Sequence, residues 1–119
     1  MRSLMKRFQG RRFECSSNRL TESVRGKITS ILWSDVIAVW ATKIDKITYQ
    51  ENFLVIDSES GDRISVGELD DDFLAVERCL RERLPIADNW SHILEESELA
   101  DIPLWRRDGN YGDRKLQLR

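Results

Sequence analysis

The sequence predicts a small α+β protein, in which an antiparallel, curved sheet of about five to seven strands is followed by an amphipathic helix and a short second helix. Between residues 13 and 67, apolar and polar side chains alternate with a period of two, which is typical of half-buried strands. The period changes to that of a helix between residues 70 and 85. The 119 residues are enough for one domain with its own core.

The strands are expected in the following order. An irregular first strand covers Phe13 to Val24, and the turn Arg25-Gly26-Lys27 leads into a second strand, Ile28 to Trp33. Ser34-Asp35 then interrupts the pattern before a longer strand, Val36 to Ile44.

A β-hairpin is expected next. The apolar run Phe53 to Ile56 is followed by Ser58-Glu59-Ser60-Gly61-Asp62, whose residue types are typical of turns, and alternation returns at Ile64 to Val66. We expect the charged hairpin tip, with Glu59 and Asp62, to be exposed.

Three consecutive aspartates, Asp70, Asp71 and Asp72, are expected to begin the amphipathic helix, since carboxylates cap helices and favour their positive end. Pro85 ends it. The apolar stripe of this helix contains Phe73, Val76, Leu80 and Leu84, with Cys79 beside it.

The last elements are shorter. Asn89 is expected to cap a helix whose buried face is Trp90, Ile93 and Leu94. Residues 102–105 then form a closing extended segment, which Pro103 confines to a sheet edge.

Charge divides the chain into three parts. Residues 1–12 and 106–119 are expected to be flexible basic ends, with five basic residues each, and residues 13–105 to be the single folded domain. The whole chain has a net charge of -2, but this domain contains 9 basic and 19 acidic residues, so its charge is about -10. Such a field disfavours nucleic acid and attracts basic partners.

The cellular compartment is inferred from the cysteines and the N-terminal residues. Cys15 and Cys79 are far apart and form no spaced motif, which favours a reducing compartment. Residues 1–10 lack the apolar stretch of a secretory signal, and no window has the roughly 20 apolar residues of a membrane-spanning helix. We therefore expect a cytoplasmic protein with no membrane insertion.

No residue pattern predicts catalysis, a metal or a cofactor. His92 is the only histidine, and we expect it at the surface or partly packed. One histidine and two separated cysteines do not form a zinc motif, and the six glycines form no nucleotide-binding loop. The four tryptophans are expected mainly in the core, with Trp105 the first candidate for an exposed interface anchor.

Several short motifs resemble those of small bacterial proteins with a pleckstrin-homology-like fold, most of them uncharacterised. The motifs are Trp33-Ser34-Asp35-Val36, Lys43-Ile44-Asp45, the helix end Leu84-Pro85 followed by Trp90, and Leu104-Trp105-Arg106-Arg107. The resemblance implies a pleckstrin-homology-like curved sheet and no catalytic residues. Since some small acidic bacterial proteins of this kind are immunity proteins, it also implies a toxin as one possible partner.

The leading hypothesis is a non-enzymatic cytoplasmic protein-binding domain, such as a bacterial immunity protein that neutralises a basic toxin domain through an acidic surface. One alternative is a module that binds an anionic ligand or lipid headgroup; others are a scaffold or adaptor, and an enzyme with an unrecognised carboxylate site. The candidate partner contacts are Glu59, Asp62, Asp70, Asp71, Asp72 and Trp105, and the candidate anion contacts are Arg25, Lys27, Lys43 and Lys46.

Overall fold

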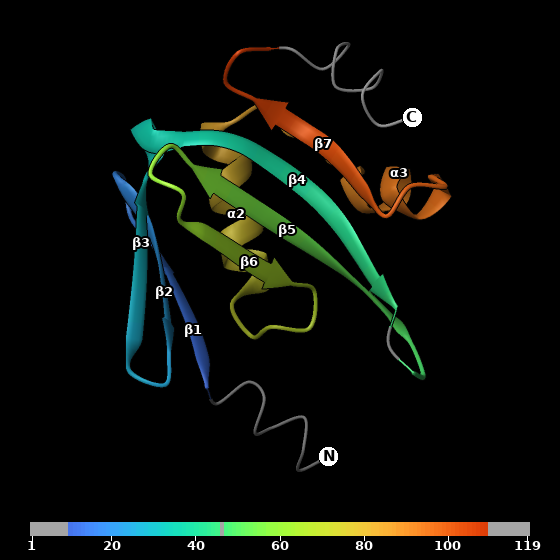
Figure 1. Ribbon diagram of the computed structural model, residues 1–119, viewed down its shortest axis with the longest axis horizontal. Coiled ribbons are helices and arrows are strands. Elements are labelled where there is room, and N and C mark those ends of the chain that lie inside the picture. Colours follow the sequence, from blue (N-terminus) through green and yellow to red (C-terminus); the bar gives the residue numbers. More distant parts are fainter. Residues whose placement is uncertain (1–9, 46, 110–119) are drawn as a thin grey trace.

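The computed structural model describes residues 10–45 and 47–109. Within them the chain forms antiparallel strands in two sheets together with two α-helices, which confirms the predicted α+β class (Figure 1). The first sheet has the order β1-β2-β3, with β1 Arg11–Cys15, β2 Arg19–Val24 and β3 Lys27–Leu32. The second has the order β6-β5-β4-β7, with β4 Val36–Asp45, β5 Gln50–Ser58, β6 Arg63–Gly67 and β7 Asp101–Arg106. A short 3-10 turn, Trp33–Asp35, joins the two sheets, and the helices are α2, Phe73–Arg83, and α3, Trp90–Glu96.

The sequence prediction was wrong at the first strand, where two strands form in place of one. The chain reverses between β1 and β2 because Ser16 and Asn18 build a turn, in which the Ser16 amide donates to the Arg19 carbonyl at 2.9 Å. β1 also begins at Arg11, two residues before the expected start of the domain. The remaining residues of the two expected flexible ends, 1–9 and 110–119, lie outside the described residues.

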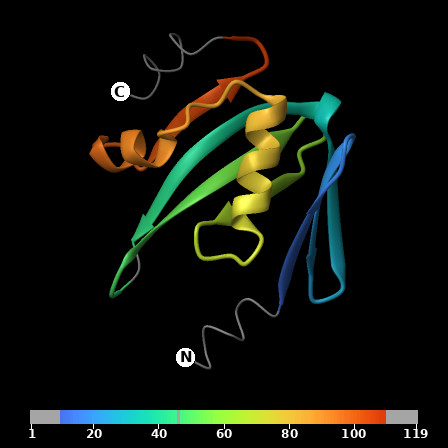
Figure 2. The same ribbon diagram turned by 180° about the vertical axis from the view of Figure 1, so that it is seen from behind.

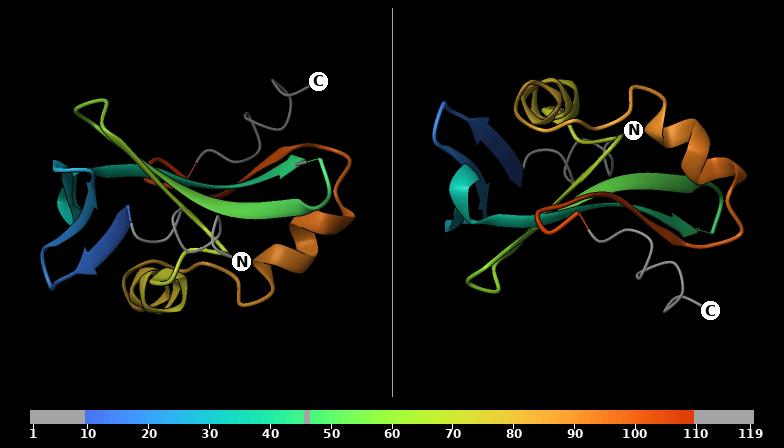
Figure 3. Two further views of the ribbon diagram at one scale, coloured as in Figure 1. Left: turned by 90° about the horizontal axis from the view of Figure 1, so that it is seen from below. Right: turned by 90° about the horizontal axis from the view of Figure 1, so that it is seen from above.

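Both helices pack on the same side of the four-stranded sheet (Figure 3). α2 crosses the open angle between the two sheets, and α3 lies near the far part of β4 (Figure 2). Of the helices in the described residues, none lies on the opposite face of the four-stranded sheet (Figure 3). Because α3 packs against the sheet with one side only, its other side and the segment after it lie at the surface.

The core lies between the sheets and the helices. α2 contributes Phe73, Val76 and Leu80 to it, which confirms most of the predicted apolar stripe. Trp90 and Leu94 of α3 are also buried, but Ile93 is 43% exposed, so the prediction for Ile93 was wrong. A helix of seven residues turns only two of these three side chains inward.

The closing segment pairs as the sequence suggested. β7 forms an edge of the four-stranded sheet beside β4, and Pro103 lies opposite Trp40 in the register. A strand edge tolerates the missing amide hydrogen of proline.

A disulfide joins Cys15 at the end of β1 to Cys79 in α2, with their Cα atoms 6.6 Å apart. The spacing of the two cysteines does not predict this pair, which forms because β1 packs against α2 and brings together residues that are 64 positions apart. The bond ties the three-stranded sheet to the main helix.

Candidate partner-binding surface

The hairpin tip is exposed as predicted. Glu59 and Asp62 lie between β5 and β6, and Glu59 forms an ion pair with Arg107 at 3.5 Å. Asp62 accepts a hydrogen bond from the Ser60 hydroxyl at 3.3 Å. Both acids reach the surface, but the charge of Glu59 is partly balanced by that of Arg107.

Two of the three aspartates before α2 have internal partners. Asp70 is only 5% exposed, and its Oδ2 accepts from the Gly67 amide at 2.8 Å and lies 3.5 Å from the Arg11 guanidinium. Asp72 Oδ2 accepts from the Phe13 amide at 2.8 Å and from Arg12 Nε at 3.1 Å. The side chain of Asp72, at the N-cap, does not cap α2 by a hydrogen bond, since its carboxylate turns to β1.

These contacts define the β1–α2 corner, formed by Arg11, Arg12, Phe13, Asp70 and Asp72. Burial alone would raise the pKa of Asp72, but the hydrogen bonds from Phe13 and Arg12 outweigh it and hold the pKa below its usual value. Arg11 also donates to the Ser65 carbonyl on β6. The corner therefore holds β1 against the start of α2 and the end of β6.

The six candidate partner contacts do not form one surface. The hairpin tip and the β1–α2 corner lie at opposite ends of β6 (Figure 1). Trp105 lies in β7, is half-buried and packs against the core. Of the aspartates before α2, Asp71 is the exposed one.

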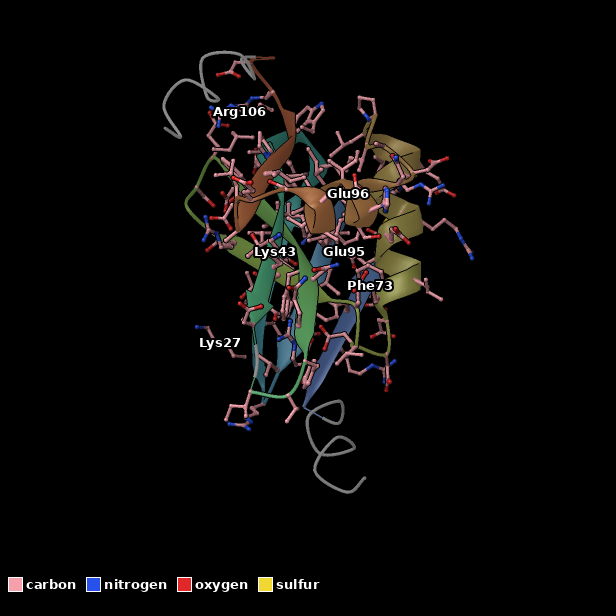
Figure 4. The ribbon with its side chains drawn as sticks, turned by 90° about the vertical axis from the view of Figure 1, so that its right-hand side faces the viewer. Lys27, Lys43, Phe73, Glu95, Glu96 and Arg106 are labelled. Atoms are coloured by element: carbon pink, nitrogen blue, oxygen red, sulfur yellow. A yellow bond between two sulfur atoms is a disulfide. The ribbon has the colours of Figure 1, made fainter. Side chains whose placement is uncertain are left out.

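The candidate anion contacts are not gathered either. Arg25 is in the exposed β2–β3 turn, with a positive φ of 51°, and Lys27 is the exposed first residue of β3. Lys43 instead donates from Nζ to the carbonyls of Leu94 and Ser97, at 3.1 and 2.6 Å. Figure 4 shows Lys43 beside α3 and away from Lys27. Lys46 lies outside the described residues.

A different acidic region stands out around α3. Between Arg83 and Arg106 the chain has five acidic residues and no lysine or arginine. Glu95 and Glu96 lie on the face seen in Figure 4, and Ile93 and Leu99 are 43% and 44% exposed. We define the α3 acidic surface as the exposed residues Glu68, Ile93, Glu95, Glu96, Glu98, Leu99 and Asp101.

Asn52 lies where this surface meets β5. Its Nδ2 donates to Glu95 Oε2 at 3.0 Å, and its backbone carbonyl accepts from the Glu68 amide at 3.0 Å. Asn52 is only 2% exposed, and its Oδ1 is buried with no hydrogen-bond partner in the described part of the chain. We call Asn52, Glu68 and Glu95 the Asn52 cluster.

The carboxylates near this cluster repel one another. Burial and the negative charge of Glu95 raise the pKa of Glu68 and outweigh a hydrogen bond with the Asn52 backbone, which lowers it; Glu51 and Glu77 add to the rise. Glu77 accepts a hydrogen bond from Trp90 Nε1 at 2.7 Å. The cluster is thus rich in hydrogen-bond acceptors and negative charge.

The other polar groups and depressions give less support for a catalytic or metal-binding role. Nε2 of His92 lies 3.2 Å from Glu96 Oε2 on the exposed side of α3. Within residues 10–45 and 47–109, no group of three His, Cys, Asp or Glu side chains is placed to hold a metal ion, and neither helix is long and apolar enough to cross a membrane. A surface depression of about 500 Å³ beside α2 is lined by residues of both charges, among them Arg78, Arg81 and Asp88.

Comparison with known proteins found no match among protein-family models, curated proteins or solved structures. The resemblance to pleckstrin-homology-like bacterial proteins therefore stays a prediction. The α3 acidic surface was missed by our reading of the sequence, although the run of acids after Arg83 could have indicated it. The approach of Glu68 to Glu95 had no signal in the sequence.

Proposed function

We propose that this protein is a non-enzymatic binding domain whose α3 acidic surface recognises a basic surface on another protein. The observation that carries the proposal is the segregation of charge: the chain has no lysine or arginine between Arg83 and Arg106, and four of the five acids in that segment lie on this surface. Opposite charges speed the encounter of two proteins and fix their register.

Exposed aliphatic side chains complete this surface. Ile93 and Leu99 lie among the acids, and interfaces combine an apolar contact with a polar rim. The carboxylates of Asp70 and Asp72 accept hydrogen bonds from backbone amides of the same chain, whereas the acids of α3 and of the segment after it are exposed. This contrast favours α3 over the β1–α2 corner as the interface.

The specific form of the proposal is a bacterial immunity protein that neutralises a basic toxin domain. A tagged copy purified from its native cell at low salt is expected to retain a basic protein that 0.5 M salt releases, because salt screens surface charge. Coexpression with the retained protein should then restore growth if that protein is toxic. Retention of acidic proteins alone would contradict the proposal.

The alternative is a module that binds an anionic ligand or lipid headgroup. Sedimentation with anionic vesicles at low salt distinguishes the two functions. Binding to the vesicles would favour the alternative, and the absence of binding is the result we expect, since the domain is acidic.

We also propose a cytoplasmic location. Cys15 and Cys79 would then be largely reduced in growing cells and form their disulfide on oxidation, because cytosolic thiols are kept reduced. Alkylation of intact cells with a thiol reagent that shifts gel mobility tests this. If neither cysteine reacts with the reagent in growing cells, the disulfide is already formed and the compartment is oxidising.

A further inference from the structure

The edge strands of the two sheets differ in how well they are protected against pairing with a further strand. β7 contains Pro103, and its register with β4 is broken by a bulge. β1 packs against α2, and Arg11 of β1 donates to the Ser65 carbonyl on β6, an edge of the second sheet. β3 has no proline, glycine or break of register, and Lys27 at its start is its only charged residue. An edge of this kind is open to pairing with another strand.

The backbone groups of β3 point alternately to β2 and to the outer side. The turn Arg25-Gly26 has two residues with positive φ, so the residues on either side of it exchange hydrogen bonds. The Trp33 amide donates to the Asn18 carbonyl at 3.0 Å, which continues this alternation to the end of the strand. Within residues 10–45 and 47–109, β2 is the only strand paired with β3. The residues whose amides and carbonyls point away from β2 are therefore Ile28, Ser30 and Leu32.

The side chains of these three residues are exposed and form a self-complementary pattern. Ile28 is 68% and Leu32 38% exposed, and Ser30 lies between them, with its hydroxyl 2.8 Å from that of Thr21. The order apolar, small polar, apolar is the same in both directions about Ser30. An antiparallel second β3 would therefore place Ile28 opposite Leu32 of the second copy and Ser30 opposite Ser30. Each of these pairs would exchange both backbone hydrogen bonds.

Charge at the two ends of β3 favours the same pairing. Arg25 and Lys27 are exposed cations at the turn before the strand, and Asp35 lies in the 3-10 turn after it. Antiparallel pairing about Ser30 brings the cations of each copy to the end of the strand at which Asp35 of the other copy lies. β3 itself contains no acidic residue, so two copies of this acidic domain can approach there without opposing carboxylates.

We propose that the protein forms a two-fold symmetric dimer in which β3 pairs antiparallel with β3 of a second copy. The two three-stranded sheets then form one continuous sheet across the dimer. α3 lies on the opposite side of the domain from β3, so each copy keeps its α3 acidic surface free (Figure 1). The dimer presents two such surfaces, which raises the avidity for a partner that has two basic sites. The dimer does not depend on the proposed function, since no residue of α3 takes part in it.

Sedimentation velocity of the full chain tests for the dimer, over concentrations from about 10 µM to about 1 mM. One pair of edge strands makes a small interface, so we expect a Kd on the order of 100 µM. The mass should rise with concentration from 14.0 kDa towards twice that value. A mass that stays at 14.0 kDa up to about 1 mM would overturn the proposal.

Two matched variants locate the contact. Ile28→Lys on β3 and Leu74→Lys on α2 each place a lysine at an exposed apolar position, since these side chains are 68% and 71% exposed. Ile28→Lys is expected to weaken the dimer by about tenfold or more, because lysines on an edge strand oppose pairing. Leu74→Lys should leave the Kd unchanged. Equal effects of the two variants, or no effect of Ile28→Lys, would contradict the assignment to β3.

Isotope-filtered NMR on a mixture of labelled and unlabelled wild-type chains tests the register without any substitution. In the proposed pairing Thr29 lies opposite Ile31 of the second copy as a non-hydrogen-bonded pair, in which the Cα atoms approach closely. We therefore expect an intermolecular nuclear Overhauser effect between their Hα protons. Intermolecular effects from other strands alone would overturn the proposal. A monomeric chain in which a captured partner contacts these two protons would assign the edge to a partner strand and also overturn it.

Discussion

Asp70 and Asp72 before α2, and Glu68 and Glu95 beside α3, are acidic residues of one small domain with opposite surroundings. Asp70 and Asp72 accept hydrogen bonds from backbone amides and contact arginines of β1. Glu68 also has a hydrogen bond with the Asn52 backbone, but burial and the nearby carboxylates, Glu95 above all, outweigh it and raise the pKa of Glu68. The same residue types therefore hold the fold together in one region and leave unbalanced charge at the surface in the other.

The difference has a physical cause in the topology. β1 brings Arg11 and Arg12 to the corner, so the acids there are neutralised within the chain. The segment that contains α3 has no basic residue other than His92, which lies 3.2 Å from Glu96, and the preceding Asp88 pairs with Arg81 of α2 at 3.1 Å. The other acids of this segment have no lysine or arginine near them in sequence.

The disulfide should have the largest effect on stability. Reduction of Cys15–Cys79 is expected to lower the free energy of unfolding by about 4 kcal/mol, because the bond closes a loop of 64 residue positions in the unfolded chain. Guanidinium chloride unfolding with and without dithiothreitol measures this. The double variant Cys15→Ser/Cys79→Ser is the control and should not respond to dithiothreitol. Identical curves for the oxidised and reduced wild type would contradict the role of the bond.

The buried aspartate of the corner should come next. Asp70→Ala is expected to cost about 3 kcal/mol, because it leaves the Gly67 amide and the Arg11 guanidinium without this acceptor. Glu98→Ala is the matched change at the α3 acidic surface and should alter stability by less than about 0.5 kcal/mol, since this side chain is exposed. Equal losses in urea unfolding would remove the contrast between the two regions.

Asp72 should show its role through pH. The pKa of Asp72 is lowered in the folded state. Its contribution to the free energy of unfolding is therefore present above the pKa of the unfolded chain, about 3.9, and is lost as pH falls through the folded pKa. Asp72→Asn should therefore cost about 1 kcal/mol at pH 7, and the difference from wild type should shrink below about pH 4. A pH-independent difference in unfolding free energy would show that the charge of Asp72 is not involved.

Glu68 should show the opposite pH dependence of stability, and the smallest effect. Since its pKa is raised in the folded state, folding is favoured below the unfolded value of about 4.3 and this advantage is lost as pH rises through the folded pKa. Glu68→Gln should be slightly stabilising at neutral pH, by less than about 0.5 kcal/mol, and neutral in acid. A destabilised Glu68→Gln at pH 7 would mean that Glu68 has a stabilising partner.

The sequence was sufficient for the elements with strong local patterns. The β5–β6 hairpin followed from its turn residues, and α2 followed from the spacing of Phe73, Val76 and Leu80. Ile93 was placed wrongly because the period of a short helix fixes its buried face poorly. Local patterns thus predict elements better than they predict which side chains are covered.

Long-range contacts explain the rest of what the sequence did not show. The aspartates before α2 have the pattern of helix caps, but Asp72 bonds to Phe13, 59 positions away. The pairing of Cys15 with Cys79 and the approach of Glu68 to Glu95 likewise depend on how the sheets and helices pack. Neither the periodicity nor the motifs of the sequence predict which distant residues come into contact.

The central claim is that the partner binds the α3 acidic surface, and the affinity of the captured partner for two charge-reversal variants tests it most directly. One variant is Glu95→Lys/Glu96→Lys/Glu98→Lys, and its match is Glu59→Lys/Asp62→Lys/Asp71→Lys, which reverses exposed acids at the hairpin tip and before α2. With folding of both verified by circular dichroism, the first should lose about 100-fold or more in affinity and the second about threefold or less at physiological salt. Equal losses, or a larger loss in the second variant, would contradict the assignment of the interface to α3.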